Sequence, residues 1–255
     1  MSDVQGDRAD RMTRFVKRMN EVERNLDSPY VRPKDAATLI LVDRSGPTPK
    51  VLLGKRHARH KFMPGRYVFP GGRVDPVDRL MPVARPLDPH VEAHLMKRLQ
   101  RPSVAKARAF ALAAVRETFE ETGLVLGVRS DDVAKVPNNG PWKAFADAGI
   151  LPDLGALRFI GRAITPPGRP RRFDARFFTT DASAIAHRIE GVTGPDAELT
   201  ELVWMTLEEA KQLDMPAVTG VMMEELDARI ADGFGHDLPV PFYSMPRGRF
   251  RRQLL

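Results

Sequence analysis

The sequence predicts a single α/β domain, in which helices cover both faces of a mixed β-sheet. Three observations lead to this fold class: an apolar strand hairpin near residue 40, one long helix in the middle of the chain, and further strands followed by a late helix. No internal repeat and no linker divides the 255 residues into two globular units. We therefore expect the domain to span residues 34–232, between a helical extension at 1–33 and a basic tail at 233–255.

The elements expected before the long helix are a short helix, a hairpin and a glycine corner. Apolar side chains recur at helical spacing in residues 12–26, which predicts an amphipathic helix packed on its own domain or on a partner in a homodimer. Residues 35–43 have the pattern of a buried strand, and residues 50–56 supply its hairpin partner after the turn SGPTP. The segment YVFPGGRVD, residues 67–75, is a short strand ending at a glycine pair. Glycines at a strand end let the backbone approach a ligand or a metal closely.

The long helix has a start signal and a stop signal. Ser103, just after Pro102, is suited to cap its first turn, and Gly123 is suited to end it. Apolar residues lie at helical spacing between them. The elements expected after it are a strand at 124–128, a loop with a short helix at 130–155, strands at 157–164 and 171–180, a strand and helix at 200–213 with Thr206 as the cap, and a last helix at 218–231.

The segment RETFEETG, residues 116–123, closes the long helix with an acidic cluster. Glu117, Glu120 and Glu121 are spaced so that an α-helix brings them onto one face, away from the apolar stripe. Like charges at this spacing destabilise a helix, whereas Mg²⁺ is held by carboxylates of this kind together with substrate phosphates. Arg116 can pair with one carboxylate and fix its rotamer. The cluster therefore indicates a metal site, and the alternative is a solvated acidic face.

The glycine corner followed by Arg-Glu-x-x-Glu-Glu-x-Gly resembles the Nudix box. In that family the box is a loop–helix–loop that binds Mg²⁺ or Mn²⁺ and hydrolyses the diphosphate bond of a nucleoside diphosphate linked to another group. The resemblance implies a Nudix-type α/β/α sandwich. It also implies that Gly72, Glu117, Glu120 and Glu121 hold the metal, and that the three glutamates and Arg116 belong to the catalytic machinery.

Two positions depart from the family pattern. At the usual spacing before Arg116, the box glycine falls on Pro102 and the intervening glutamate falls on Arg108. If Gly72 is the box glycine, about thirty extra residues lie before the helix, a length that is usually functional or partly structured. We therefore expect an insertion inside the box at about residues 76–102. No residue is assigned the role of the intervening glutamate.

An upstream stretch resembles the signature of coenzyme A diphosphatases within the Nudix family. Arg56, Lys61, Gly65 and the run Phe69 to Gly72 fall at the signature's spacings, whereas Gly54 and His57 depart from it, and Lys61 replaces an arginine. Coenzyme A carries a 3′-phosphate beside its diphosphate and needs additional cationic contacts. The resemblance implies coenzyme A or acyl-coenzyme A as substrate. The alternatives are ADP-ribose, NADH or another nucleotide-sugar type of substrate.

Several residues outside the box are candidates for substrate contacts. The resemblance implies that the general base is a box glutamate or a carboxylate on a later loop. Glu198 and Glu201, just before the strand at Val203, are such carboxylates, although an ordinary acidic loop is the simpler interpretation of each. Arg172 and Arg176, together with Arg56 and Lys61, could bind phosphate, and Phe173 could stack on a base. Arginines at a strand edge and alternating aromatic residues are also common structural features.

Composition narrows the classes of function. No stretch approaches the roughly 18 apolar residues that a membrane span requires, and no secretory segment is evident, so we expect a cytoplasmic protein without a membrane partner. The absence of cysteine excludes disulfides, thiol nucleophiles and cysteine-bound zinc. The net charge of +7 suits a polyanionic nucleotide substrate. The alternatives of another class are a nucleotide-sensing module without catalysis, which the intact glutamates disfavour, and an RNA-binding protein, for which the sequence offers no aromatic platform.

Overall fold

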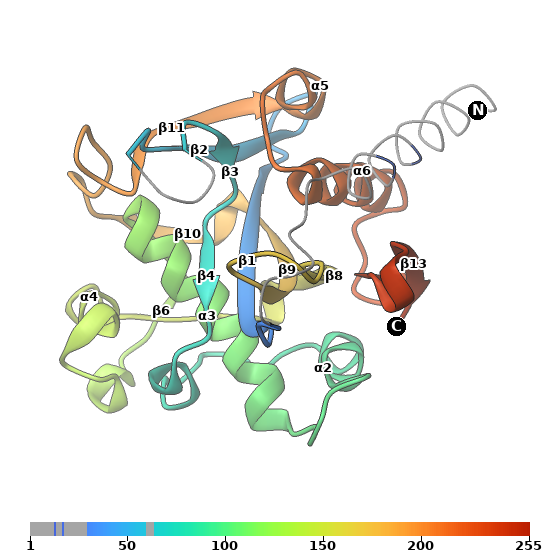
Figure 1. The fold of residues 1–255 in the computed structure, drawn as a ribbon. Coiled ribbons are helices and arrows are strands. Elements are labelled where there is room, and N and C mark those ends of the chain that lie inside the picture. Colours follow the sequence, from blue (N-terminus) through green and yellow to red (C-terminus); the bar gives the residue numbers. More distant parts are fainter. Residues whose placement is uncertain (1–12, 14–16, 18–29, 60–63) are drawn as a thin grey trace.

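The computed structural model of the chain describes residues 13, 17, 30–59 and 64–255 (Figure 1). The amphipathic helix expected at residues 12–26 and the candidate phosphate ligand Lys61 lie outside the described part, apart from Thr13 and Lys17. The structure confirms the predicted fold class: it is an α/β structure with one large mixed sheet between helices.

Nine strands form the main sheet, in the order β11-β2-β1-β9-β8-β12-β13, with β3 paired to β2 and β4 paired to β1. The β1–β9 and β8–β12 pairs are parallel and the other pairs are antiparallel. The strands of this sheet are β1 Lys34–Asp43, β2 Lys50–Arg56, β3 Tyr67–Val68, β4 Gly71–Arg73, β8 Arg158–Ile164, β9 Phe173–Asp181, β11 Leu199–Thr206, β12 Pro241–Ser244 and β13 Arg251–Leu254. Two small sheets pair β5 Leu124–Leu126 with β10 Ile185–Arg188, and β6 Val128–Arg129 with β7 Ile150–Leu151.

The two faces of the sheet carry separate cores. Alternate residues of a strand point to opposite faces. Accordingly, Leu39 and Leu41 of β1 pack with one set of helices, and Ile40 and Val42 pack with the other. The first set is α2 Pro89–Met96, α3 Val104–Thr122 and α4 Lys143–Asp147, and the second is α5 Leu207–Lys211 and α6 Ala217–Ala231 (Figure 1). The result is the expected three-layer sandwich.

Helix α3 begins and ends where the local signals predict. The side chain of Ser103 accepts a hydrogen bond from the backbone N–H of Lys106, at 3.2 Å. Gly123 ends the helix with a φ of 74°, a left-handed conformation that glycine adopts without steric cost. These two ends determine where the acidic turn at Glu117–Glu121 lies relative to the sheet.

The segment 233–255, expected as a basic tail outside the domain, is instead part of the main sheet. Strand β12 adds to β8, and β13 pairs with β12 at the sheet edge. Phe242, Tyr243 and Phe250 of this segment are buried. The apolar surface that these aromatic rings bury explains why the segment joins the sheet despite its positive charge.

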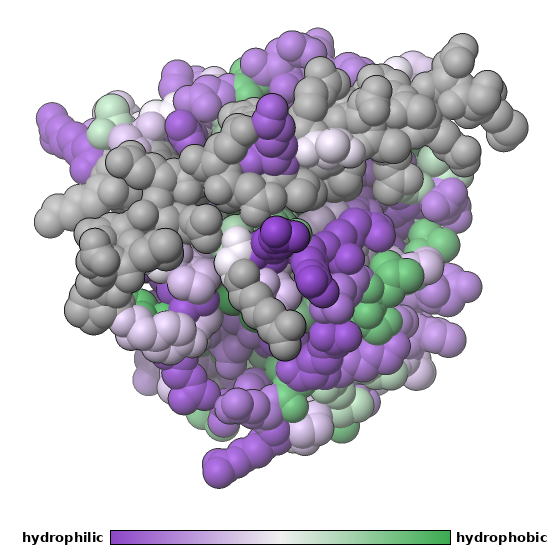
Figure 2. Space-filling view, turned by 45° about the vertical axis from the view of Figure 1, so that its right-hand side comes forward, coloured by the Kyte–Doolittle hydropathy of each residue, from purple (hydrophilic) through white to green (hydrophobic). Residues whose placement is uncertain are grey.

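The insertion is ordered as well. A short 3-10 helix at Pro76–Arg79 precedes most of it, and it contains the helix α2, whose Val91 and Leu95 are buried in the core beside α3. No helix within the described residues is long and apolar enough to cross a membrane. On the coloured part of the face shown in Figure 2, hydrophilic residues predominate and hydrophobic ones form small separate groups.

Candidate functional site

The glycine corner lies directly against the acidic turn of α3. Gly72 pairs with Ala37 across β4 and β1, and its bare Cα faces the carboxylate of Glu117. A Cβ built on Gly72 would lie only 2.4 Å from the Cδ and Oε2 atoms of Glu117. The backbone N–H of Gly71 donates to the Glu121 Oε2 atom at 3.3 Å. Two segments far apart in the sequence therefore meet, and the contact requires glycine at residue 72.

Arg116 fastens the corner to the helix. Its Nη2 donates to the carbonyl oxygen of Arg73 at 2.8 Å, next to the glycine pair. Its Nη1 donates to Glu117 Oε1 at 2.9 Å and to Glu120 Oε2 at 2.5 Å. One guanidinium thus fixes the rotamers of two carboxylates and the position of the β4 backbone.

Asp78 holds the remaining side of that guanidinium, and the sequence analysis did not assign it a role. Its carboxylate accepts from Arg116 Nε at 2.7 Å and from Nη2 at 3.2 Å, and it is fully buried. Asp78 lies six residues after Gly72, the distance at which the box pattern has its acidic residue. The spacing of the box pattern identifies Asp78 when it is counted forward from Gly72. The same pattern counted backward from Arg116 leads to Arg108.

Arg108 has a different position and partners. Its guanidinium donates to the carbonyl oxygens of Arg79 and Met81, within the insertion. The insertion expected at about residues 76–102 therefore starts later, because the turn at Asp75–Asp78 belongs to the site. A capping box closes that turn, in which Asp75 accepts from the Val77 backbone and Asp78 accepts from the Asp75 backbone.

The three glutamates differ in burial. Glu120 is exposed, Glu117 is mostly covered, and Glu121 is only 7% exposed. The helical pattern predicted that all three face away from the core, and for Glu121 this prediction is wrong. Burial, with the nearby charges of Glu198 and Glu117, raises the pKa of Glu121 well above its ordinary value. Burial also raises the pKa of Glu117, although Arg116 opposes this. For Arg116 itself, burial would lower the pKa, but the hydrogen bonds and charge of Asp78 outweigh it and raise that pKa.

These side chains fit a hard divalent cation. The site offers carboxylate oxygens beside a backbone corner without side chains, and its buried carboxylate lies close to other negative charges. Such an arrangement costs free energy unless a positive charge compensates it. Among the described residues, no three acidic or histidine side chains already converge as a closed metal site. Arg116 holds the carboxylates of Glu117 and Glu120, and Glu121 accepts from the Gly71 backbone.

A second group of residues lies at the end of β2. Arg56 forms an ion pair with Glu198, with Nη2 and Oε1 at 2.7 Å, and the backbone N–H of His57 donates to the Glu198 carbonyl at 3.1 Å. The charges of both Arg56 and Glu198 act on the pKa of Glu121, which places the pair within electrostatic reach of the acidic turn.

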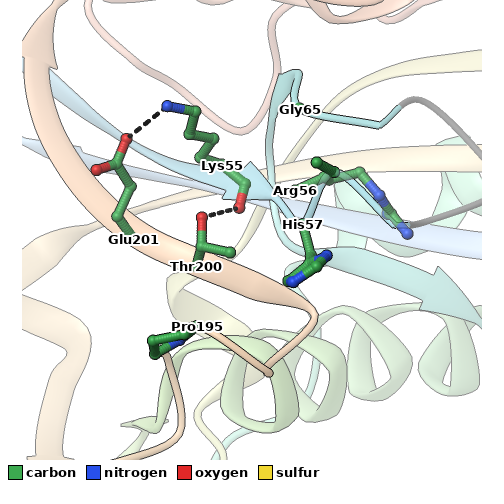
Figure 3. Close-up of a pocket in the computed structure, with 8 residues that line it drawn as sticks. Lys55, Arg56, His57, Gly65, Pro195, Thr200 and Glu201 are labelled. Atoms are coloured by element: carbon green, nitrogen blue, oxygen red, sulfur yellow. Dashed lines mark hydrogen bonds and ion pairs between the residues drawn. The ribbon is translucent and has the colours of Figure 1, made fainter.

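Arg56 also lines an open cavity of about 350 Å³ (Figure 3). Figure 3 shows Lys55 beside Thr200 and reaching toward Glu201, and Arg56 and His57 next to each other away from these three. Lys55 Nζ lies 3.6 Å from Glu201 Oε1, and Thr200 donates to the Lys55 carbonyl at 3.2 Å. Among its described lining residues are Ala58, Gly65 and Pro195. Lys55 was not predicted as a site residue, although it directly precedes Arg56 in the signature.

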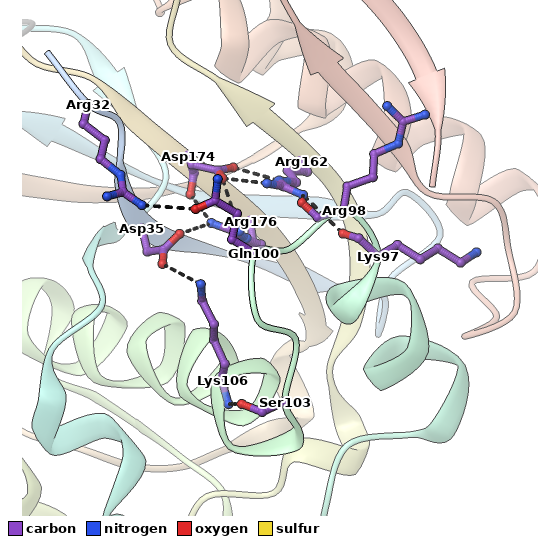
Figure 4. A network of polar contacts seen from close by, with 10 residues as sticks. All are labelled: Arg32, Asp35, Lys97, Arg98, Gln100, Ser103, Lys106, Arg162, Asp174 and Arg176. Carbon is purple, nitrogen blue, oxygen red and sulfur yellow. Dashed lines mark hydrogen bonds and ion pairs between the residues drawn. The ribbon is translucent and has the colours of Figure 1, made fainter. Parts of the chain in front are cut away.

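Arg172 and Arg176, expected to contact phosphate, are buried structural residues. Arg176 is 1% exposed and bonds to Asp35 at 2.8 Å (Figure 4). It also stacks over Phe110 of α3. Arg172 donates to the carbonyl oxygens of Thr165 and Val31. Both guanidiniums are therefore engaged inside the protein, and neither is available to a phosphate at the surface.

Phe173 is also separate from the acidic turn. It starts β9, where it pairs with Lys34, and its backbone N–H donates to the Thr165 hydroxyl at 3.0 Å. It is not among the described residues that line the cavity beside Arg56. The structure thus brings together Gly72, Arg116 and the three glutamates with Arg56 and Glu198, and leaves Arg172, Phe173 and Arg176 elsewhere.

Comparisons with known proteins agree with this fold and motif. A crystal structure of a Nudix hydrolase from Alicyclobacillus acidocaldarius is 28% identical and superposes with a TM-score of 0.57, over 80% of this chain and 96% of that one. Acyl-coenzyme A diphosphatase NUDT19 of Gallus gallus is 25% identical over 236 residues, which cover 69% of this chain and 62% of that protein. The chain thus spans less than two thirds of this curated relative. No family model matches the sequence.

The three-layer fold and the split motif define the class of protein, and the comparisons agree: the chain is a member of the Nudix hydrolase family. Within the family it resembles the coenzyme A diphosphatases.

Proposed function

We propose that this protein is a metal-dependent Nudix hydrolase that cleaves the diphosphate bond of coenzyme A or acyl-coenzyme A. The observation that carries the proposal is the contact of Gly72 with Glu117, fastened by Arg116 and Asp78. A role in fold stability alone gives no reason to gather three carboxylates on one turn, because like charges at this spacing destabilise the helix. A site for a cation and a diphosphate does give such a reason.

Glu117, Glu120 and Glu121, with the carbonyl oxygen of Gly72, are the groups that would hold Mg²⁺ or Mn²⁺. When bound, the cation neutralises phosphate charge and lowers the pKa of a water molecule. Arg116 keeps the carboxylates of Glu117 and Glu120 oriented before the substrate arrives, which reduces the cost of ordering them during the reaction. Asp78 keeps Arg116 in place from the opposite side.

Glu198 is the candidate general base. In hydrolysis the water oxygen bonds to one phosphorus, the bridging oxygen leaves with the other phosphate, and the water proton passes to a base. Glu198 lies on the loop before β11, is 44% exposed in its side chain and is held by Arg56 at 2.7 Å. Arg56 would orient this carboxylate and present its remaining donors to a substrate phosphate.

The cavity beside Arg56 supports a substrate with an additional phosphate. Lys55 and Arg56 supply two cationic side chains there, and His57 lies next to them. The volume of about 350 Å³ lies within the range of small-molecule pockets. The resemblance to an acyl-coenzyme A diphosphatase points to the same substrate class.

A panel of substrates tests the proposal. Purified protein is incubated with coenzyme A, acyl-coenzyme A, ADP-ribose, NADH and nucleoside triphosphates, with Mg²⁺ or Mn²⁺, and the products are identified by mass. We expect coenzyme A substrates to give adenosine 3′,5′-bisphosphate and the phosphopantetheine half. Faster cleavage of ADP-ribose or NADH would refute the substrate class and leave the hydrolase assignment standing.

Two glutamine variants test the site itself. Glu120→Gln and Glu121→Gln keep the side-chain shape and remove the charge that would bind the cation. Each should lower kcat by at least about 100-fold with an unchanged circular dichroism spectrum. Glu190→Gln, an exposed acidic residue on the loop after β10, is the matched control and should retain wild-type turnover. Wild-type turnover in both site variants would disprove the assignment.

A further inference from the structure

A second cavity lies where the insertion meets the C-terminal hairpin. It measures about 430 Å³ and its described lining residues are Arg98, Ser244, Pro246, Arg251 and Gln253. Neither the turn at Arg98 nor the hairpin of β12 and β13 has a role in the hydrolase site described above. A volume of this size is sufficient for a small organic ligand.

The register of the hairpin explains which side chains face this cavity. Ser244 pairs with Arg251, and Phe242 pairs with Gln253, so these four side chains lie on one face of β12 and β13. Tyr243 and its partner Arg252 on β13 occupy the other face, toward Glu225 of α6. The polar face therefore turns toward the insertion.

Arg98 lies at the cavity on a turn with an unusual backbone conformation. Its φ is 55°, a left-handed value that a non-glycine residue adopts at a cost. Arg162 stabilises this turn by donating to the carbonyl oxygens of Lys97 and Arg98, at 3.3 and 3.4 Å. Figure 4 shows the Arg98 side chain extending away from the ion pairs around Asp35 and Asp174.

The two arginines of the cavity are available to an anion. Arg98 donates one hydrogen bond to Gln253 Oε1 at 3.1 Å and lies over the Phe242 ring at 5.7 Å. Neither Arg98 nor Arg251 forms an ion pair with any residue that the structure describes. A guanidinium offers five donors in a planar fork that matches a phosphate, and the Ser244 hydroxyl adds another donor.

We propose that this cavity binds a small organic phosphate, with its phosphate group between Arg98 and Arg251. The Ser244 hydroxyl donates to a third oxygen of the phosphate, and the organic part lies against Pro246. The hydrogen bond to Gln253 and the contact with the Phe242 ring hold the Arg98 guanidinium before binding, which reduces the entropy lost when the ligand arrives. This site is independent of the proposed hydrolase activity.

Binding is measured on the full chain in EDTA, so that hydrolysis does not contribute. The probes are phenyl phosphate, inorganic phosphate and citrate, followed by ¹H–¹⁵N NMR shifts at low ionic strength. We expect saturable binding of phenyl phosphate at millimolar concentration or below, tighter than that of citrate. Arg98→Gln and Arg251→Gln should each weaken it about tenfold or more, whereas Arg98→Lys should retain part of the affinity.

Arg129→Gln is the matched control. Arg129 lies exposed on β6, far from β13 in Figure 1, and its replacement removes the same charge from the protein. Unchanged affinity in this variant supports a local site, and thermal unfolding confirms that every variant is folded. Equal weakening by Arg129→Gln, tighter binding of citrate, or no saturable binding in the wild type would overturn the proposal.

Discussion

Replacing Gly72 with alanine tests the geometry of the site with a single methyl group. The new Cβ would lie 2.4 Å from the Glu117 carboxylate, whereas ordinary contacts begin at 3.4 Å, so the carboxylate must withdraw by about 1 Å. Gly72 does not have a positive φ, and alanine is therefore compatible with its backbone. A displacement of about 1 Å in a reacting group can cost on the order of 100-fold in rate, and we expect kcat/KM to fall by about that factor.

The assay compares kcat/KM of wild type and Gly72→Ala on the best substrate of the panel, at saturating Mg²⁺. Thermal unfolding should show little change, because the clash involves the end of a side chain and not the backbone. Gly46→Ala is the control, since a Cβ at that position meets nothing within 4 Å. Wild-type turnover in Gly72→Ala would show that the position of Glu117 against the corner does not matter for activity, and the reasoning would fail.

Three further predictions concern the partners of the corner. Asp78→Ala should lower the free energy of unfolding by about 3 kcal/mol in urea titrations, because it removes the fully buried partner of the Arg116 guanidinium; a loss below about 0.5 kcal/mol would contradict the assigned role. EDTA should abolish turnover, and a cation at 100 times its Kd should stabilise the folded state by about 2.7 kcal/mol, visible as a higher Tm; unchanged Tm and turnover would count against a metal. Arg56→Gln should lower kcat/KM more for coenzyme A than for ADP-ribose, and an equal loss on both would remove the coenzyme A argument.

Features that depend on local chemistry were predictable from the sequence. Ser103 and Gly123 set the ends of α3, and Thr206 caps α5 with the reciprocal bonds of a capping box, because these contacts involve residues within one turn. The hairpin of β1 and β2 follows from apolar strands joined by a turn. The fold class followed from the order of these elements.

The positions of isolated charges were harder to predict, because they depend on contacts between distant segments. Arg176 occurs beside aromatic residues in a strand, and only the packing of α3 against β9 shows that Phe110 and Asp35 enclose it. The burial of Glu121 has a similar origin. Its helix presents it to the glycine corner and to the loop of Glu198, neither of which is visible in the helical periodicity.

The split in the Nudix box shows why an insertion leaves the site intact. The corner and the helix are joined by the bonds of Arg116 to Arg73 and Asp78, and these bonds do not depend on the length of chain between them. The entropy of closing a loop rises only slowly with its length, by about 0.6 kcal/mol for each doubling. The burial of Val91 and Leu95 against the core offsets part of that cost, since each buried aliphatic side chain contributes about 1.5–3 kcal/mol. The insertion begins after Asp78. Extra residues between Gly72 and Asp78 would move Asp78 away from the glycine corner, and Arg116 would lose the carboxylate that holds it in place.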